Sequence, residues 1–388
     1  MKDAIVVGGG PAGVASALFL RQRGHEVLLL DKARFPRDKI CGESVSPEAW
    51  RLLDALGMAE RVRGLKPQPV LGMTLTSPDG TRFAGRYPDD RQGFAIRRER
   101  LDALLLHAAR DGGVEVREGV AALELIRRDG RVAGVRCDTD ALPARLVIGA
   151  DGRDSMVARG LGLRRGDPLR RFAIRAHFDG VQGLSQHGEM HVIAGAYCGI
   201  APLSATSANV AVVLEPRELR AARGDLPGFF ARLLKRWPEV QARLQGARLL
   251  GPPRALGPLA VRARRLSAPG ALLVGDAAGF YDPFTGEGIT LALRSAELMA
   301  PVADAALRSG RLDDLSRYDR ERDAATRDKF LLNRLLQRLI GWPALADAVA
   351  RRLRRRGDLA DRLVGIAGDF LPARGALRTR FLWQLMTA

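Results

Sequence analysis

Apolar residues change their spacing along the chain, and the spacing predicts where strands and helices lie. Four apolar residues at 4–7 predict a short buried strand, and the Ala- and Leu-rich stretch 12–23 predicts a helix that stops before Gly24. A second apolar run, 27–30, ends in Asp31. The chain therefore begins with a strand–turn–helix–strand unit.

The pattern beyond this unit divides the chain further. Residues 32–47 are polar and interrupted by Pro and Gly, which predicts a long loop. Residues 70–87 alternate as a hairpin, and 170–215 hold short strand-like runs without helical periodicity. From 288 onward the spacing is helical again. We expect an α/β protein with a separate sheet and a helical C-terminal region.

Three glycines lie at the turn between the first strand and the first helix, in the spacing Gly8-x-Gly10-x-x-Gly13. The first allows a tight turn, the second lets the backbone approach a pyrophosphate, and the third lets the helix pack against the strand. The helix N-terminus offers unpaired N–H groups to the anion. Asp31, about 20 residues further on, can bind both hydroxyls of an adenosine ribose. This context indicates a dinucleotide site, with NAD and FAD both open.

Composition narrows the class of protein. The 388 residues are 46% hydrophobic, enough for a full core, and no run of 18 apolar residues predicts a membrane-spanning helix. Because a first strand is predicted from about residue 3, we expect no signal peptide. The cysteines are odd in number and far apart, which fits a reducing cytoplasm. They are Cys41, Cys137 and Cys198.

The net charge of +18 is carried almost entirely by arginine, a bias that a GC-rich coding sequence gives, and basic and aromatic residues do not interleave. We therefore expect no nucleic-acid partner. Residues 330–388 concentrate the charge, with 11 Arg against 4 Asp, a net +7. Leu345, Val349 and Leu353, with the arginines of 351–356, could form a basic amphipathic helix at an anionic lipid surface. A packed helix with a solvated arginine face is the simpler interpretation, which we favour.

Two further motifs follow apolar strands. Residues 149–159 begin Gly-Ala-Asp-Gly-Arg-Asp-Ser, and residues 275–289 run from Gly-Asp-Ala-Ala-Gly to Asp-Pro-Phe-Thr-Gly-Glu-Gly-Ile. Together with the glycine turn, their order and spacing over roughly 3–310 resemble the flavoproteins of the para-hydroxybenzoate hydroxylase superfamily. Within it, the loop 35–43 and the Thr-Gly-Glu-Gly sequence at 285–288 look like the geranylgeranyl reductase branch.

This resemblance implies a discontinuous Rossmann-like FAD-binding domain at 1–169 and 262–310, with a parallel sheet and a small antiparallel one. It implies an inserted, mostly antiparallel substrate-domain sheet at 170–261 and a C-terminal helical region at 311–388. NAD(P)H is implied as a transient hydride donor. The implied cofactor-binding residues are Gly8, Gly10, Pro11, Ala12, Gly13, Asp31, Lys32, Arg37, Cys41, Gly42, Arg98, Asp151, Gly152, Gly275, Asp276, Pro283, Gly286, Glu287, Gly288 and Ile289.

Several of these residues have an expected role. Asp276 would accept a hydrogen bond from a ribityl hydroxyl, and the helix from Gly288 would place its positive end at the N1–C2=O edge of reduced flavin. Asp151 and Gly152 would lie at the pyrophosphate and the approach of the nicotinamide nucleotide. By resemblance, Arg98 would lie near the flavin and Arg37 at the cofactor edge.

The candidate catalytic residues are Cys41 and Glu43. Cys41 lies against the flavin if the resemblance to the reductases holds, and is a small buried hydrophobe otherwise. Glu43 faces the substrate or caps a turn. His187 and His191 lack the spacing of metal ligands on a helix, so we expect no metal site.

Three reactions fit the resemblance. A hydroxylase takes hydride from NAD(P)H and inserts oxygen into an apolar aromatic, polyketide-like or lipid-like substrate through a flavin C4a-hydroperoxide. A reductase passes hydride to an activated or prenyl double bond. A halogenase is disfavoured because its Trp-x-Trp-x-Ile-Pro motif is absent; every tryptophan is isolated, at positions 50, 237, 342 and 383. Three scattered cysteines exclude an iron–sulfur cluster.

Between hydroxylase and reductase we favour the hydroxylase, because the resemblance implies that free-standing members of about this length are often hydroxylases. We expect a cytoplasmic enzyme of secondary metabolism. A flavin-bound redox sensor or scaffold at a membrane or nucleic acid is the non-enzymatic alternative. The inserted sheet favours an enzyme, because we expect it to cover the flavin with an apolar substrate pocket. Residues expected to face the flavin are Ile200, Ala201, Pro202 and Val212.

Overall fold

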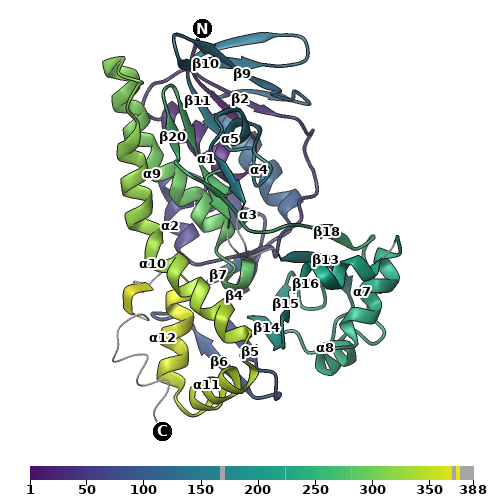
Figure 1. The fold of residues 1–388 in the computed structure, drawn as a ribbon. Helices are drawn as coiled ribbons and strands as arrows, with labels where there is room; N and C mark the ends of the chain where they lie inside the picture. The colour runs from purple at the N-terminus through teal and green to yellow at the C-terminus, as the bar shows by residue number, and fades with distance from the viewer. Residues whose placement is uncertain (167–170, 223, 281, 369–372, 376–388) are drawn as a thin grey trace.

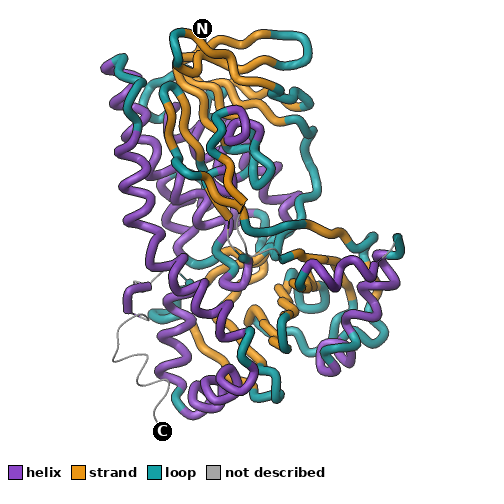
Figure 2. The backbone as a smooth tube through the Cα atoms, viewed as in Figure 1, coloured by secondary structure: helices purple, strands orange, loops and turns teal. Residues whose placement is uncertain are grey.

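The computed structural model of the chain describes residues 1–166, 171–222, 224–280, 282–368 and 373–375 (Figure 1). Strands gather in two regions, one at the top of the view and one at the lower right, and long helices run along the left side (Figure 2). The predicted mixture of parallel and antiparallel sheets with helices is confirmed.

The upper sheet is built on the strand–turn–helix–strand unit of the N-terminus. Its central strands pair in parallel and are buried on both faces, which explains why they read as unbroken apolar runs. In order across the sheet, the strands are β20 (Ser267–Ala268), β21 (Ala271–Leu273), β11 (Ala141–Gly149), β1 (Lys2–Val7), β2 (Val27–Asp31) and β8 (Glu115–Glu118), with β10 (Arg131–Arg136) and β9 (Glu124–Arg128) joined to β11.

Helices cover one face of the upper sheet and a small antiparallel layer covers the other. Ala4 and Val6 of β1 pack toward the helices, whereas Ile5 and Val7 pack toward β10 and α5. The helices of this part are α1 (Pro11–Arg21), α2 (Glu48–Ala55), α3 (Ala59–Gly64), α4 (Arg98–Asp111), α5 (Met156–Gly160) and α9 (Gly288–Ser309).

The second sheet, called the substrate sheet below, is mostly antiparallel. Its order is β17 (Arg248–Leu249), β13 (Phe172–Asp179), β16 (Ala208–Leu214), β15 (Ala196–Pro202), β14 (His187–Ile193), β5 (Gly72–Thr76) and β6 (Arg82–Arg86), with β18 (Arg254–Leu256) also on β13. The predicted hairpin within 70–87 is therefore present as β5 and β6. It joins the substrate sheet through parallel pairing with β14, so this sheet also takes strands from outside 170–261.

The two faces of the substrate sheet have different partners. Ile200 and Val212 point into an apolar core with α7 (Leu226–Leu234) and α8 (Pro238–Arg243), at the right of Figure 1. The expectation that they face the flavin is wrong, because side chains alternate along a strand and these belong to the helix-covered face. Ala201 lies on the opposite face, where it packs with Ala95.

The remaining elements are short. Two small sheets connect the larger ones: β3 (Ser44–Val45), β7 (Gly93–Ala95) and β4 (Gln68–Val70) form one, and β12 (Arg164–Gly166), β19 (Val261–Ala263) and β22 (Gly279–Phe280) form the other. The short helix α6 (Pro216–Leu219) precedes α7.

The described part of the C-terminal region forms the helices α10 (Ser316–Ile340), α11 (Pro343–Arg355) and α12 (Gly357–Ala367), and residues 369–372 and 376–388 of the predicted helical region lie outside the described residues. In Figure 1, α11 and α12 lie below the substrate sheet, beside β6. Leu353 is buried and Val349 is half-buried in a cluster with Phe83 of β6. Val349 and Leu353 are therefore packed against the protein, whereas Leu345 of the same predicted stripe is 37% exposed.

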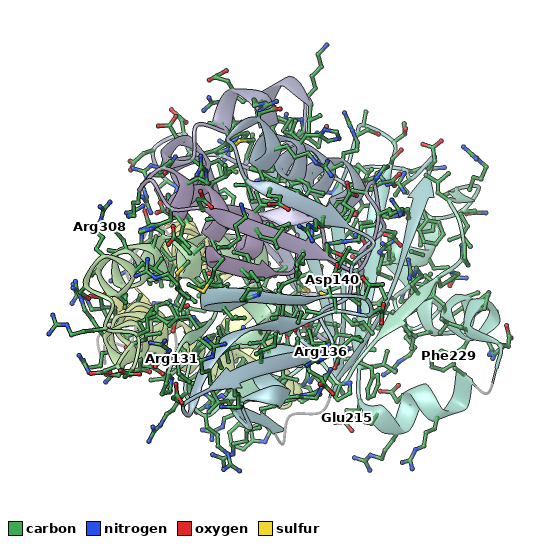
Figure 3. The ribbon with its side chains drawn as sticks, turned by 90° about the horizontal axis from the view of Figure 1, so that it is seen from above. Arg131, Arg136, Asp140, Glu215, Phe229 and Arg308 are labelled. Carbon is green, nitrogen blue, oxygen red and sulfur yellow. The ribbon has the colours of Figure 1, made fainter. Side chains whose placement is uncertain are left out.

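Charge is distributed over the surface. Arg308, at the end of α9, projects from the periphery of the molecule (Figure 3), and its side chain is 64% exposed. No helix among the described residues is long and apolar enough to cross a membrane.

Candidate functional site

The glycine turn has the geometry that its spacing predicts. Gly8 has φ +110°, and a Cβ there would lie 2.4 Å from the Ala150 carbonyl oxygen. A Cβ on Gly13 would lie 1.7 Å from the Gly8 carbonyl oxygen, so the helix approaches the strand too closely for any side chain. Space is open beside Gly10, where the nearest atom to a Cβ is Arg37 Nη2 at 3.8 Å. The opening lies at the N-terminus of α1, where no side chain caps the helix.

Asp31 closes the turn from the end of β2. Its two carboxylate oxygens accept hydrogen bonds from the Gly9 N–H at 2.7 Å and the Ala33 N–H at 2.8 Å. The carboxylate is therefore fixed beside the glycines, with lone pairs left for ribose hydroxyls. The neighbouring Lys32 is exposed.

A cluster of cations lies next to the turn. Arg98, at the start of α4, donates from Nε and Nη2 to both oxygens of Asp102, at 2.8 and 2.7 Å. Arg37 Nη1 lies 3.1 Å from the same carboxylate. Asp102 is fully buried, so one carboxylate orients two arginines. Sequence analysis missed Asp102, although its i, i+4 spacing from Arg98 was a visible signal.

Lys39 lies in the same cluster. A Cβ on Gly152 would lie 3.5 Å from Lys39 Nζ, so the lysine reaches the second motif. Burial lowers the pKa of Lys39, and the nearby carboxylate of Asp276 opposes this shift. The loop that carries Lys39 therefore lies beside both the motif of 149–159 and the motif of 275–289.

The Asp151 carboxylate holds the second motif together. Its Oδ2 accepts from the Met156 and Val157 N–H groups at 2.6 and 3.2 Å, which caps α5. Its Oδ1 and the Nε of Arg153 are buried without a hydrogen-bond partner among the described residues. Burial raises the pKa of Asp151 above its ordinary value. Asp151 thus supports Ser155, the N-cap of α5, and is also an orphaned acceptor at the predicted cofactor edge.

Asp276 follows β21 at the end of the upper sheet. Burial raises its pKa, and the positive charges of four side chains oppose the shift. They are Lys39, Arg98, Arg153 and Arg322. Arg322, from α10, is a contribution of the C-terminal region that sequence analysis missed.

The third motif ends in a turn that starts α9. Gly286 is left-handed with φ +70°, and Glu287 stands at the N-cap position, with its carboxylate 3.1 Å from Lys329 Nζ of α10. Ile289 is buried in the core of the upper part. The predicted start of a long helix near Gly288 is confirmed, and the N-terminus of this 22-residue helix lies at the turn.

The same motif touches the substrate sheet. The Tyr197 hydroxyl of β15 donates to Asp282 Oδ1 at 2.5 Å, and its ring meets Phe284 edge-on at 5.1 Å. Gln337 Nε2 of α10 donates to the same oxygen at 2.8 Å. Burial raises the pKa of Asp282. These contacts fix the turn of 282–287 against one edge of the sheet face.

Glu43 fixes the other loop, 38–43, against the same face. It is fully buried and left-handed, with φ +59°. Its Oε1 accepts from the Arg98 N–H at 2.9 Å, and its Oε2 contacts His177 Nε2 at 2.6 Å and accepts from Asn209 Nδ2 at 2.9 Å. Glu43 therefore does more than cap a turn, because it joins the loop, α4 and the substrate sheet.

Two further contacts hold this loop. Asn209 Nδ2 also donates to the Cys41 carbonyl at 2.8 Å, and Arg175 ion-pairs with Asp38. Sequence analysis missed Arg175, His177 and Asn209. Arg175 and His177 are polar residues at alternate positions of β13, which is otherwise mostly apolar, and this pattern could have indicated them.

Cys41 lies at the centre of the loop. Its thiol is free and half-buried, and it accepts a hydrogen bond from the Glu43 N–H at 3.4 Å. Burial disfavours the charge on Arg98, but Asp102 and Cys41 outweigh it and raise the pKa of that guanidinium. Gly42 is exposed, with open space around it.

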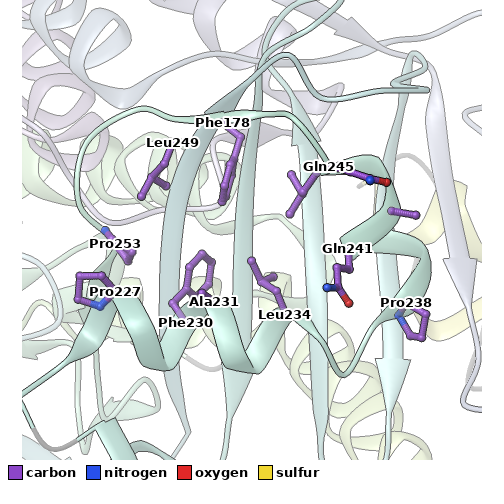
Figure 4. A pocket seen from close by; sticks show the side chains of 12 residues that line it. Phe178, Pro227, Phe230, Ala231, Leu234, Pro238, Gln241, Gln245, Leu249 and Pro253 are labelled. Carbon is purple, nitrogen blue, oxygen red and sulfur yellow. The ribbon is translucent and has the colours of Figure 1, made fainter.

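Two pockets differ in their relation to these residues. An apolar pocket of about 600 Å³ lies between α7, α8 and β13, lined by residues such as Phe178, Ala231 and Leu234 (Figure 4). It is on the helix-covered side of the substrate sheet, away from the motifs. A much smaller one, about 30 Å³, is lined by Asp276, Gly288 and Arg322.

FAD fits the arrangement. The open cradle at Gly10 suits a pyrophosphate, and the excess of cations beside it matches two phosphate charges. The orphaned Asp151 Oδ1 and Arg153 Nε supply an acceptor and a donor at the same edge. The half-buried Asp276 and the N-terminus of α9 stand where the ribityl chain and the N1–C2=O edge of the flavin would lie.

Comparison with known proteins agrees with this fit. Residues 1–329 match the model of the FAD binding domain family. The chain belongs to this family, and it is an FAD-dependent oxidoreductase.

The chain is similar to several proteins whose names are known. The chain is 30% identical over 324 residues to the menaquinone reductase of Mycobacterium tuberculosis, covering 78% of this chain and 76% of that protein. It is 29% identical over 329 residues to the digeranylgeranylglycerophospholipid reductase of Methanothrix thermoacetophila, covering 79% of each. The flavin-dependent brominase Bmp2 has the same fold, with a TM-score of 0.83 at 20% identity, covering 95% of this chain and 93% of that one.

Proposed function

We propose that this protein is a reductase that takes hydride from NAD(P)H and saturates a carbon–carbon double bond of an apolar, lipid-like substrate. The observation that carries the proposal is the half-buried Cys41 thiol beside the Arg98 guanidinium, on the loop between the cofactor cradle and the substrate sheet. The similarity to two proteins named as reductases supports it.

The chemistry follows from the residues. Saturating a double bond requires a hydride and a proton, and FAD when bound supplies the hydride. The Cys41 thiol can give the proton, and the adjacent Arg98 stabilises the thiolate that remains. Asp102 keeps Arg98 in place. Water returns the proton to Cys41 after turnover.

The test is anaerobic turnover with NADPH or NADH and two candidate substrates, a prenylated quinone and a geranylgeranyl lipid, with products identified by mass. A product that has gained two hydrogen atoms supports the proposal. Replacing Cys41 by Ala should slow saturation while leaving reduction of FAD by NAD(P)H unchanged. Saturation at the wild-type rate in that variant would remove Cys41 from the mechanism.

Hydroxylation of an aromatic substrate is the second candidate. Arg175, His177 and Asn209 favour it, because they place polar groups on the sheet face where a ring hydroxyl would be oriented. A product that contains one oxygen atom from O₂ would identify this reaction.

We further propose that the corner of α10 and α11 contacts an anionic membrane surface in the cytoplasm. Trp342 is 71% exposed and Leu345 is 37% exposed at this corner, and Arg338 is exposed in the last turn of α10. An exposed tryptophan close to an exposed arginine suits the interface of an anionic bilayer. The site of contact thus differs from the stripe of Val349 and Leu353.

A further inference from the structure

A glutamate stands at the N-cap of α9, a position where short polar side chains are usual because they accept from the first N–H groups of a helix. Glu287 does not cap the helix in this way. Its carboxylate instead accepts from Thr285 Oγ1 at 3.3 Å and from Lys329 Nζ at 3.1 Å. The first turn of α9 is therefore left without a side-chain cap, although its N-cap residue carries a carboxylate.

The ion pair between Glu287 and Lys329 is buried. The side chain of Glu287 is 7% exposed and that of Lys329 is 12% exposed. Lys329 belongs to α10, which sequence analysis placed in a C-terminal region outside the FAD-binding domain. Because solvent screens a buried pair only weakly, the loss of one partner leaves a charge that acts strongly on its surroundings.

The small pocket at this turn is lined by charges of both signs. Five charged side chains are among the described residues that line it, three acidic and two basic. Both cations come from α10, where they are seven positions apart and so lie on one face of the helix. Without the charge of the lysine, three carboxyl groups would stand against one arginine. The five residues are Asp276, Asp282, Glu287, Arg322 and Lys329.

The charge at the start of α9 matters for the cofactor, because the flavin edge expected there becomes more negative when the flavin is reduced. The positive end of a helix favours that change, and a carboxylate at the same place opposes it. Gly288, the first residue of α9, lines the same pocket as Lys329. The lysine therefore lies where its charge can offset that of Glu287.

We propose that Lys329 is a positioning residue for the cofactor, which holds the Glu287 carboxylate away from the first N–H groups of α9 and offsets its charge. The N-terminus of α9 thereby stays positive toward the reduced flavin. The ion pair gives bound FAD a higher reduction potential than the carboxylate alone would allow. The inference goes beyond the proposed reaction, since it holds for a reductase and for a hydroxylase alike.

The charges require shifts of opposite sign when the two partners are replaced singly. Lys329→Met leaves the carboxylate without its cation, which disfavours the reduced flavin and lowers the reduction potential. Glu287→Gln leaves the cation without its carboxylate, which raises the potential. The double variant loses both charges, so its potential should return close to that of the wild type. An ion pair that only stabilised the fold would be weakened by either change and would give no shifts of opposite sign.

The test measures the reduction potential of the FAD-bound enzyme against a reference dye, during slow reduction by xanthine oxidase at pH 8.5. Lys329→Arg keeps the charge and should keep the potential. Arg327→Met is the matched control, because it removes a cation of α10 whose side chain is 71% exposed and paired with Asp323. FAD content and circular dichroism check that each variant is folded.

We expect Lys329→Met to weaken the binding of reduced FAD relative to oxidised FAD at least tenfold, which lowers a two-electron potential by about 30 mV. Glu287→Gln should raise the potential, and Arg327→Met should leave it unchanged. Shifts of the same sign in both single variants, or no shift in either, would overturn the inference. If Lys329→Met does not retain FAD, the Glu287→Gln variant decides: a higher potential supports the inference, and a lower or unchanged one overturns it.

Discussion

Glu43 Oε2 and His177 Nε2 lie 2.6 Å apart, although the two residues are 134 positions apart in the chain. Arg175 Nη1 contacts the other ring nitrogen, Nδ1, at 2.9 Å. Because a guanidinium has only donors, Nδ1 must accept, so His177 is neutral and its Nε2–H donates to the Glu43 carboxylate. Glu43 thus accepts three hydrogen bonds, from α4 and from two strands of the substrate sheet.

Replacing Glu43 by Gln should destabilise the protein, because one amide –NH₂ would then face groups that are themselves donors. We expect the free energy of unfolding to fall by roughly 2–4 kcal/mol in chemical denaturation. Glu99→Gln on the exposed side of α4 is the matched control, with a change within about 0.5 kcal/mol. Equal, small effects at both positions would show that the network around Glu43 is not formed.

Arg98 and Asp102 should couple strongly, because the pair is buried and bidentate. In a double-mutant cycle of Arg98→Met and Asp102→Asn, we expect a coupling of roughly 2–4 kcal/mol in the free energy of unfolding. Arg317 and Glu321 have the same i, i+4 spacing on exposed α10. Their coupling should stay within about 0.5 kcal/mol. Equal coupling energies for the Arg98–Asp102 pair and the Arg317–Glu321 pair would contradict the burial of the Arg98–Asp102 pair.

Asp276 should reduce the stability of the FAD-free protein at neutral pH. Its pKa is raised above 3.8 by burial, so the folded protein binds the proton more tightly than the unfolded chain. The unfavourable contribution of Asp276 to the free energy of unfolding is absent well below pH 3.8. It is fully present above the raised pKa that Asp276 has in the folded protein. Asp276→Asn should therefore raise the apoprotein's melting temperature at pH 7, with no gain at pH 3, and weaken FAD binding. A lower melting temperature at pH 7 would mean that the carboxylate is stabilised by its neighbours.

The proposed membrane contact predicts flotation with anionic vesicles. At low salt, vesicles rich in phosphatidylglycerol should carry the protein, and vesicles of phosphatidylcholine alone should not. Replacing Trp342 and Leu345 by Ala should abolish flotation. Leu249→Ala, at a similarly exposed position on β17, should not alter it. Flotation that is independent of lipid charge would reject the proposal.

The parts of the site that the sequence predicts are those held in contiguous segments. The glycine turn, Asp31 and the turn that starts α9 each depend on local conformation, so their spacing in the sequence reflects their geometry. The partners of Glu43 depend on strand pairing between distant segments. No local spacing determines which loop such a strand will meet.

The error at Ile200 and Val212 has the same origin. Successive side chains of a strand point to opposite faces of the sheet, so the sequence divides them into two sets. Both faces of the substrate sheet are covered by other parts of the protein, so hydrophobicity does not show which set faces the cofactor. Only the placement of α7 and α8 assigns the apolar set to the side away from the cofactor.

The most direct test of the reductase account is a single turnover of enzyme whose FAD has been reduced beforehand. The reduced enzyme is mixed with an unsaturated substrate once without oxygen and once under ¹⁸O₂. The account predicts that the cofactor is reoxidised by the substrate without oxygen, with one double bond saturated per FAD. Reoxidation only under ¹⁸O₂, with the label in the product, would contradict it and establish a hydroxylase.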